Sequence, residues 1–193
     1  MCFLLEVLLV AIFTPLLYIK KMNNKTDLRI KAKAIRSNLN ILNISEKLTC
    51  KVKDNVYYQE AKNVMLYYPA KYEVNLLGLL DDIKKNFYFP RVAGAEMLVC
   101  PYKKGDKLEK SSFNIMEPCS NPVCSDILDL IVVPALLVDK NGYRLGYGGG
   151  FYDRFLASCR GRVKTICAVP QQLLVEQLQH EDFDIPVDFI VCA

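Results

Sequence analysis

The sequence predicts a layered α/β domain with a largely parallel central sheet. Short apolar segments alternate with helix-like segments along the chain, which is the pattern of this fold class. Residues 130–138 are almost wholly apolar and rich in Val and Leu, as expected for a strand buried on both faces. With 193 residues, 52% of them hydrophobic, the chain is long enough to bury one substantial core.

The first predicted element is a helix that starts near Thr26. Thr26 or Asp27 can cap it, and its apolar stripe is formed by Leu28, Ala32, Ile35 and Leu39. The remaining predicted elements, in chain order, are a helix at 56–62, a strand at 64–68, an amphipathic helix at 73–83, strands at 87–91 and 96–102, a charged hairpin end at 103–110, a loop at 121–125, a strand at 130–133, a turn at 140–142, a helix at 151–160, a strand at 163–169, a helix at 171–178 and a strand at 189–192.

Composition excludes several functional classes. The net charge of +4 is compatible with anionic small ligands, but it is too weak to indicate nucleic acid as a partner. None of the eight cysteines forms a Cys-x-x-Cys pair, so we expect no zinc site. Several cysteines lie in apolar runs, and we interpret these as small buried hydrophobes in a reducing, cytoplasmic setting. His180 is the only histidine, and its polar surroundings favour a surface position over a catalytic triad.

Residues 1–21 form an apolar extension that we expect to lie outside the fold, which leaves a single domain at 22–193. A membrane segment needs about 20 apolar residues, and Glu6 interrupts this stretch while Lys20 and Lys21 follow it. The preferred interpretation is that translation begins at Met22. The alternative is a genuine N-terminal anchor, and only in that case do we expect contact with a membrane.

Residues 144–150 read RLGYGGG and stand between the buried strand and the helix expected from Phe151. Glycines let backbone N–H groups approach an anion closely, and a helix N-terminus adds unpaired N–H groups and a favourable dipole. Arg144 and Arg154 bring positive charge, and Asp153 brings a carboxylate suited to Mg²⁺. The Walker and dinucleotide-binding patterns do not fit this spacing. The pattern favours a phosphate site with a metal ligand beside it over a tight turn between packed elements.

The longer segment 144–156, RLGYGGGFYDRFL, resembles the signature of the 5-formyltetrahydrofolate cyclo-ligase family, and the resemblance extends from Lys25 to Asp188. It implies a three-layer Rossmann-like domain related to sugar-phosphate isomerase and CoA-transferase folds. It also implies conversion of 5-formyltetrahydrofolate to 5,10-methenyltetrahydrofolate, with ATP as co-substrate and Mg²⁺ as cofactor. We expect a cytoplasmic monomer.

The resemblance assigns roles to particular residues. Those expected to bind ATP are Lys25, Arg29, Arg144, Leu145, Gly146, Tyr147, Gly148, Gly149, Gly150, Phe151 and Tyr152. Those expected to bind the folate are Tyr68, Glu73, Tyr147, Gly148, Gly149, Gly150 and Phe151. Arg144, Tyr152 and Asp153 are the expected catalytic residues, and Asp153 and Asp188 the expected Mg²⁺ ligands.

Each assignment has a plainer alternative. Lys25 and Arg29, with Lys33 and Arg36, could form a solvated basic helix face. Glu73 could be a favourable charge in the first turn of a helix, and from residues alone the two interpretations are equally good. Asp188 could be a strand-edge carboxylate.

Two segments resemble the family but contain replaced residues, and the role of one further residue stays open. Asn75 replaces the usual Asp near Glu73, and Asn114 replaces the usual Gly in the segment 113–118; Asn tolerates unusual φ as Gly does. Pro90-Arg91 matches a family element. Whether Glu117 acts in catalysis or only shapes the pocket stays open.

The expected mechanism transfers the γ-phosphoryl group of ATP to the formyl oxygen, after which N10 attacks and closes the ring. The protein has mainly to align the reactants and neutralise charge. The alternatives are a sugar-phosphate isomerase, against which the Lys25/Arg29 and Asp153/Asp188 pairs argue, and a non-catalytic nucleotide-binding regulator.

Overall fold

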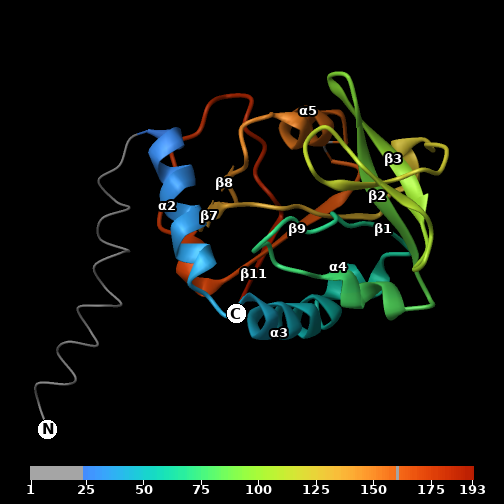
Figure 1. Cartoon of the computed structure of the whole chain (residues 1–193), viewed down its shortest axis with the longest axis horizontal. Coiled ribbons are helices and arrows are strands. Elements are labelled where there is room, and N and C mark those ends of the chain that lie inside the picture. The colour runs from blue at the N-terminus through green and yellow to red at the C-terminus, as the bar shows by residue number, and fades with distance from the viewer. Residues whose placement is uncertain (1–23, 160) are drawn as a thin grey trace, which may run out of the picture.

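A six-stranded sheet forms the centre of the molecule, in the order β11-β9-β6-β1-β2-β3 (Figure 1). The structure, a computed structural model, describes residues 24–159 and 161–193; the expectations for residues 1–21 lie outside them. The strands of this sheet are β1 (Asn63–Met65), β2 (Asn86–Ala93), β3 (Glu96–Tyr102), β6 (Leu130–Val132), β9 (Lys164–Val169) and β11 (Phe189–Cys192). Neighbouring strands are parallel except for β2 and β3, which form an antiparallel hairpin at one edge. The predicted mixed α/β class with a largely parallel sheet is confirmed.

Two smaller sheets and a set of helices complete the described part of the chain. The small sheets are β10-β7-β8, made of β7 (Leu137–Asp139), β8 (Arg144–Leu145) and β10 (Leu174–Val175), and the pair β4 (Leu108–Lys110) with β5 (Met116–Pro118). The helices are α2 (Lys25–Ser37), α3 (Ile41–Lys53), α4 (Val56–Glu60) and α5 (Phe151–Cys159), with 3₁₀ turns η1 (Leu77–Asp81), η2 (Ser125–Ile127) and η3 (Gln171–Leu173).

Alternate residues of the central strands face two different hydrophobic clusters. In β6, Leu130 and Val132 pack with Leu48 of α3, whereas Ile131 packs with Leu156 of α5. The side-chain period of a strand is two residues, so an unbroken apolar run fills both faces of the sheet. Figure 1 shows the result, with α3 and α4 on one side of the sheet and α5 on the other.

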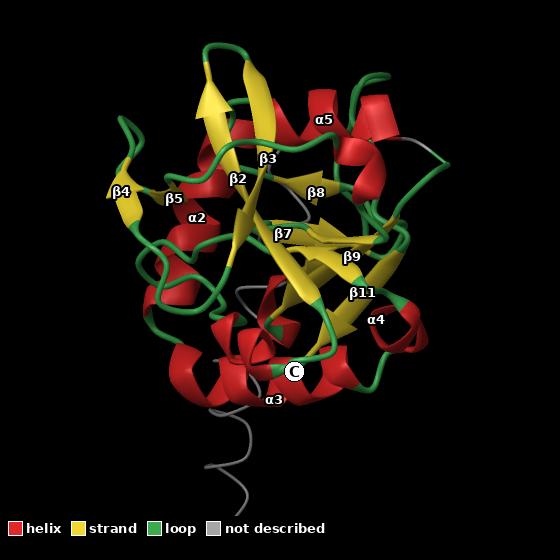
Figure 2. Cartoon of the chain, turned by 90° about the vertical axis from the view of Figure 1, so that its right-hand side faces the viewer, coloured by secondary structure: helices red, strands yellow, loops and turns green. Residues whose placement is uncertain are grey.

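Helix α2 and the β2–β3 hairpin border the region that contains the candidate site. α2 packs on the small sheet through a third cluster that includes Leu28, Ala32 and Leu145. Figure 2, turned by 90°, shows the long β2–β3 hairpin at the edge, with α5 beside one of its ends. Among the described residues, no helix is long and apolar enough to cross a membrane.

Several predicted elements differ from the structure. α2 is capped by Asn24, whose side chain accepts from Thr26 N at 2.8 Å, and not by Thr26 or Asp27. α3 was not predicted. The helix at 56–62 ends at Glu60. The turn at 103–106 joins β3 to β4, and the hairpin expected there lies at β4–β5 instead.

The helix predicted at 73–83 is wrong. Only the 3₁₀ turn Leu77–Asp81 forms, and Ile83 is 96% exposed. The N–H of Leu77 donates to the side-chain oxygen of Asn75 at 2.9 Å, and such a local turn competes with a helix at this point.

The helix predicted at 171–178 is also wrong. After the turn Gln171–Leu173, residues 174–175 form β10 beside β7. The pairing of this strand with the buried β7 overrides the amphipathic pattern.

Candidate active site

The glycine loop at 146–150 is carried by β8 and ends where α5 begins. Gly148 and Gly150 have φ values of 105° and 65°, in the left-handed region that glycine adopts at little cost. A Cβ added to Gly149 would lie 2.8 Å from the Phe151 ring, and one added to Gly150 would lie 2.8 Å from an Arg154 nitrogen. Larger residues at these two positions would displace their neighbours, so the course of the loop depends on its glycines.

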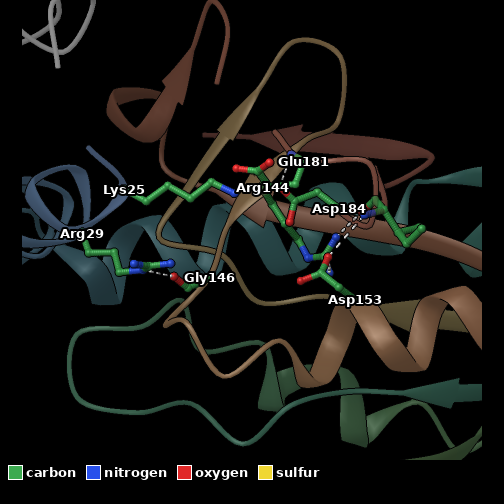
Figure 3. Close-up of polar contacts among 8 residues, drawn as sticks. Lys25, Arg29, Arg144, Gly146, Asp153, Glu181 and Asp184 are labelled. Carbon is green, nitrogen blue, oxygen red and sulfur yellow. Dashed lines mark hydrogen bonds and ion pairs between the residues drawn. The ribbon is translucent and has the colours of Figure 1, made fainter. Parts of the chain in front are cut away.

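α2 brings two cations to this loop (Figure 3). The Nε of Arg29 donates to the carbonyl of Gly146 at 2.9 Å, and the guanidinium carbon lies 3.4 Å from where a Gly148 Cβ would stand. Lys25 Nζ lies 2.8 Å from Asp184 Oδ2. The contacts of Arg29 and Lys25 join positions 117 and 159 residues apart. Both side chains are partly buried against the site, so the alternative of a solvated basic face does not describe them.

Arg144 is held by Asp153 and by the main chain of the C-terminal segment. Its guanidinium lies 2.9 Å from Asp153 Oδ1, with only 3% of the side chain exposed, and it also donates to the carbonyl of Ile185. The N–H of Ile185 returns a hydrogen bond to Asp153 Oδ1 at 3.3 Å. The predicted catalytic pair Arg144 and Asp153 is therefore in direct contact, oriented by Ile185.

Asp184 completes this charged cluster. Burial alone raises the pKa of its carboxyl, but hydrogen bonds from Lys25 and from the Glu181 N–H, together with the charges of Lys25 and Arg144, lower the pKa below its ordinary value. The Glu181 N–H donates to Asp184 Oδ2 at 2.9 Å. An ionised Asp184 thus holds the Lys25 ammonium beside the loop.

Glu73 contacts the loop residue Tyr147 and is 7% exposed. It precedes the turn Leu77–Asp81 rather than opening a helix, so the interpretation as a first-turn charge is wrong. Its carboxylate accepts from Ala70 N at 2.7 Å and from the Tyr147 hydroxyl at 2.6 Å. Burial, with the charge and the hydrogen bond of Glu73, raises the pKa of Tyr147.

The other predicted aromatic residues surround the loop in different ways. The ring of Phe151 lies 5.6 Å from that of Phe113 at 72°, and 5.0 Å from the Arg154 guanidinium. The ring of Tyr68 packs edge-on against Phe89 at 6.1 Å. Tyr152 has a buried hydroxyl without a partner among the described residues, and burial raises its pKa.

Leu145 can meet a ligand at this loop only through its main chain. Its side chain is 4% exposed and belongs to the core cluster under α2.

The predicted metal ligands have separate partners. Among the described residues, both hydrogen bonds to the Asp153 carboxylate fall on Oδ1, and Oδ2 is the oxygen that would face a cation. Asp188 Oδ2 accepts from the N–H and hydroxyl of Thr165 at 2.8 and 2.6 Å, and Asp188 borders a cavity of about 400 Å³ whose lining does not include Asp153. No cluster of three or more metal-binding side chains occurs in the described part of the chain. Because Mg²⁺ often uses one or two carboxylates plus substrate phosphates, Asp153 fits a cation that arrives with a nucleotide.

The two family-like segments around Arg91 and Glu117 bind each other. Arg91 donates to the carbonyls of Pro118 and Ser120 at 3.1 and 2.9 Å, and Glu117 accepts from Val92 N at 3.3 Å. They border a cavity of about 290 Å³. Asn114 has φ of 60°, as its replacement of Gly implies. Through these contacts Arg91 and Glu117 fix the lining of this cavity.

Two residues of the site were missed from the sequence. Arg36, assigned there to a solvated face, is 3% exposed and lies 3.8 Å from Glu73. Its spacing of four and eight residues from the buried Ala32 and Leu28 was the available signal. Asp184 stands in a polar stretch, and nothing in that pattern distinguishes it.

Comparisons with known proteins agree on one family. The sequence matches the profile of the 5-formyltetrahydrofolate cyclo-ligase family over residues 20–193. The 5-formyltetrahydrofolate cyclo-ligase of Haemophilus influenzae is 28% identical over 176 residues, covering 84% of this chain and 94% of that protein. The mouse enzyme of the same name is 29% identical over 161 residues, covering 75% and 79%.

A solved structure is similar over most of the chain. The NMR structure of Aquifex aeolicus 5,10-methenyltetrahydrofolate synthetase has a TM-score of 0.75 and 34% identity, and the match covers 87% of this chain and 89% of that one.

Proposed function

This chain belongs to the 5-formyltetrahydrofolate cyclo-ligase family, and we propose that it converts 5-formyltetrahydrofolate and ATP into 5,10-methenyltetrahydrofolate, ADP and phosphate by way of a phosphorylated formyl oxygen. One observation carries the proposal furthest. Two segments distant in sequence, α2 and β8, supply the cations around one glycine loop: Arg29 contacts Gly146, Arg144 pairs with Asp153 at the start of α5, and Lys25 pairs with Asp184. Cations and loop amides of this kind stabilise the charge of a transferring phosphoryl group.

The chemistry explains why no nucleophilic side chain is needed. A formamide carbon is a poor electrophile, and its oxygen is a poor leaving group. Transfer of the γ-phosphoryl group to that oxygen changes both, so that N10 attacks the carbon and phosphate leaves with the former formyl oxygen. The role of the protein is to hold the formyl oxygen in line with the γ-phosphorus and to prevent unproductive orientations of the two substrates.

Lys25, Arg29 and Arg144 act on the nucleotide side of the loop in this proposal. The residues of 144–152 offer main-chain N–H groups, and the start of α5 adds its dipole. Lys25 exchanges Asp184 for a phosphate oxygen when ATP binds. That exchange is feasible because Asp184 is partly exposed, at 17% of its side chain, and can return to water.

Tyr68, Glu73, Tyr147 and Phe151 act on the folate side. A buried carboxylate is an acceptor for the N–H groups of a pterin, and Glu73 is held in place by Ala70 and Tyr147. Phe151 and the facing Phe113 offer aromatic faces to a flat ring.

Asp153 is the residue that would hold Mg²⁺ through Oδ2, and Asp188 remains a proposed second ligand. Bound Mg²⁺ would supply positive charge that neutralises the phosphates of ATP. Tyr152 is also proposed as a catalytic residue, because its buried hydroxyl has no hydrogen-bond partner among the described residues. We also propose a monomer in the cytoplasm, which sedimentation and cell fractionation would test.

The test is formation of 5,10-methenyltetrahydrofolate, followed by its absorbance, in a mixture of protein, ATP, Mg²⁺ and 5-formyltetrahydrofolate. We expect turnover by the natural chain, and a loss of about 10²-fold or more in kcat for Asp153→Ala with an unchanged circular dichroism spectrum. Undiminished turnover in that variant would remove Asp153 from the site. ATP binding without turnover by the natural chain would favour a non-catalytic nucleotide-binding regulator.

A further inference from the structure

Arg36 is a buried cation that the roles above leave unused. It lies on the inward face of α2, eight residues after Leu28, and is 3% exposed. An arginine is seldom buried to this extent without specific partners. Its guanidinium donates to the carbonyl of Ala135, which follows β6, and its Nη1 lies 3.8 Å from Glu73 Oε1.

A tyrosine hydroxyl lies between the two charges. Arg36 Nη1 donates to the Tyr147 hydroxyl at 3.4 Å, and that hydroxyl donates to Glu73 Oε1 at 2.6 Å. The chain of contacts therefore runs from α2, through the glycine loop, to the carboxylate on the folate side. Tyr147 as a whole is 50% exposed, so its ring is accessible while its hydroxyl is engaged.

Arg36 also balances the charge of Glu73. A buried carboxylate is strongly destabilising unless a cation and hydrogen bonds accompany it. The ion pairs of the described residues place Arg36 beside Glu73, whereas Lys25 and Arg144 pair with Asp184 and Asp153. The Nε of Arg36 is buried and has no hydrogen-bond partner among the described residues. The internal hydrogen bonds of Arg36 are therefore incomplete, which a purely structural arginine would not require.

We infer that Arg36 is a positioning residue, which fixes the Glu73 carboxylate and the Tyr147 hydroxyl for 5-formyltetrahydrofolate and so links α2 and the glycine loop to the folate side of the site. The inference rests on the proposed role of Glu73. It goes further by assigning a function to a residue that does not itself need to touch either substrate.

The experiment is a double-mutant cycle with two readouts. The variants are Arg36→Met, Glu73→Gln and the double variant, and the readouts are the Kd of 5-formyltetrahydrofolate by calorimetry and the KM values for both substrates. Removal of a charged hydrogen-bond partner should raise the Kd and KM for the folate by about tenfold or more, with the KM for ATP within about twofold. In the Glu73→Gln background, Arg36→Met should add little, because residues that act through one another are not additive.

A purely structural role predicts a different outcome. Arg36→Met would then lower the melting temperature and leave the folate Kd of the folded protein unchanged, and this result would overturn the inference. Full additivity in the cycle would do the same. Arg36→Lys, which keeps the charge without the planar fork, should restore part of the affinity. If Arg36→Met does not fold, Arg36→Lys takes its place in the cycle, and an unchanged Kd in that variant would also overturn the inference.

Two controls separate the possible failures. Arg162→Met removes an exposed arginine paired with Asp126 at the far end of α5 and should leave both readouts unchanged. Calorimetry separates the inference from the proposed reaction: if the natural chain binds the folate but makes no methenyl product, the proposed activity fails while the effect of Arg36→Met on the Kd still decides the role of Arg36. If the natural chain binds no folate, both the proposed activity and the inference about Arg36 are contradicted.

Discussion

At the scale of single residues, three cations of the site are paired with carboxylates of the protein before any ligand arrives. Lys25 has Asp184, Arg144 has Asp153 and Arg36 has Glu73. Unpaired buried charges are costly, and internal pairing offers each one a partner until a substrate replaces it. The free energy of ATP binding is then the free energy gained from the new phosphate contacts minus the free energy lost when the internal ion pairs are broken.

Arg144 provides a direct test of this account. Arg144→Ala removes the cation that contacts Asp153 and Ile185, so we expect the KM for ATP to rise by about tenfold or more while the KM for the folate changes little. Steady-state kinetics measures both values. Lys140→Ala is a matched control, since it breaks an exposed pair with Glu176, and such pairs contribute little. An unchanged KM for ATP in Arg144→Ala would remove this residue from the phosphate site.

Asp184 predicts a dependence of stability on pH. Its pKa is lower in the folded protein than its ordinary value of 3.8, so its contribution is present above that value and is lost as pH falls through the folded pKa. Urea unfolding of the natural chain and of Asp184→Asn should therefore show a stability gap at about pH 6 that narrows toward about pH 3. A gap that is constant or widens at low pH would show that Lys25 does not stabilise the ionised form.

At the scale of elements, α2 matters because its first residue is Lys25. Asn24 caps this helix by accepting from Thr26 N, and loss of such a cap costs about 1 kcal/mol. Asn24→Ala should lower the melting temperature slightly and raise the KM for ATP, because the first turn carries Lys25. Asn40→Ala removes the corresponding cap of α3, which Figure 1 shows packed under the sheet. Equal effects of both variants on the KM for ATP would contradict the role of the first turn.

Elements whose structure is determined by their own local sequence pattern could be predicted. The apolar run around β6 and the glycines before α5 placed the central strand and the loop correctly. α3 was missed although Ile41, Ile44, Leu48 and Val52 have helical spacing after Asn40. The segments at 73–83 and 171–178 were predicted wrongly for another reason, since the Asn75 side chain closes a turn with Leu77 N in the first and β7 pairs with residues 174–175 in the second. Sequence periodicity does not contain those partners.

At the scale of the whole molecule, topology converts distant segments into one site. α2, the loop after β8 and the segment 181–185 meet at one place, as Figure 3 shows. The resemblance named Lys25, Arg29, Arg144, Asp153 and Glu73. In the structure Arg29 contacts Gly146, Arg144 contacts Asp153, Lys25 contacts Asp184 and Glu73 contacts Tyr147. Pairings such as Lys25 with Asp184 span most of the chain. They depend on the sheet order, so local sequence did not reveal them.

The most direct test of the account follows the formyl oxygen. 5-Formyltetrahydrofolate labelled with ¹⁸O in its formyl group is incubated with the protein, ATP and Mg²⁺, and the released phosphate is analysed by mass spectrometry. If the glycine loop and its cations deliver the γ-phosphoryl group to that oxygen, each phosphate released carries one ¹⁸O for each methenyl product formed. Unlabelled phosphate, with the ¹⁸O recovered in water, would contradict it.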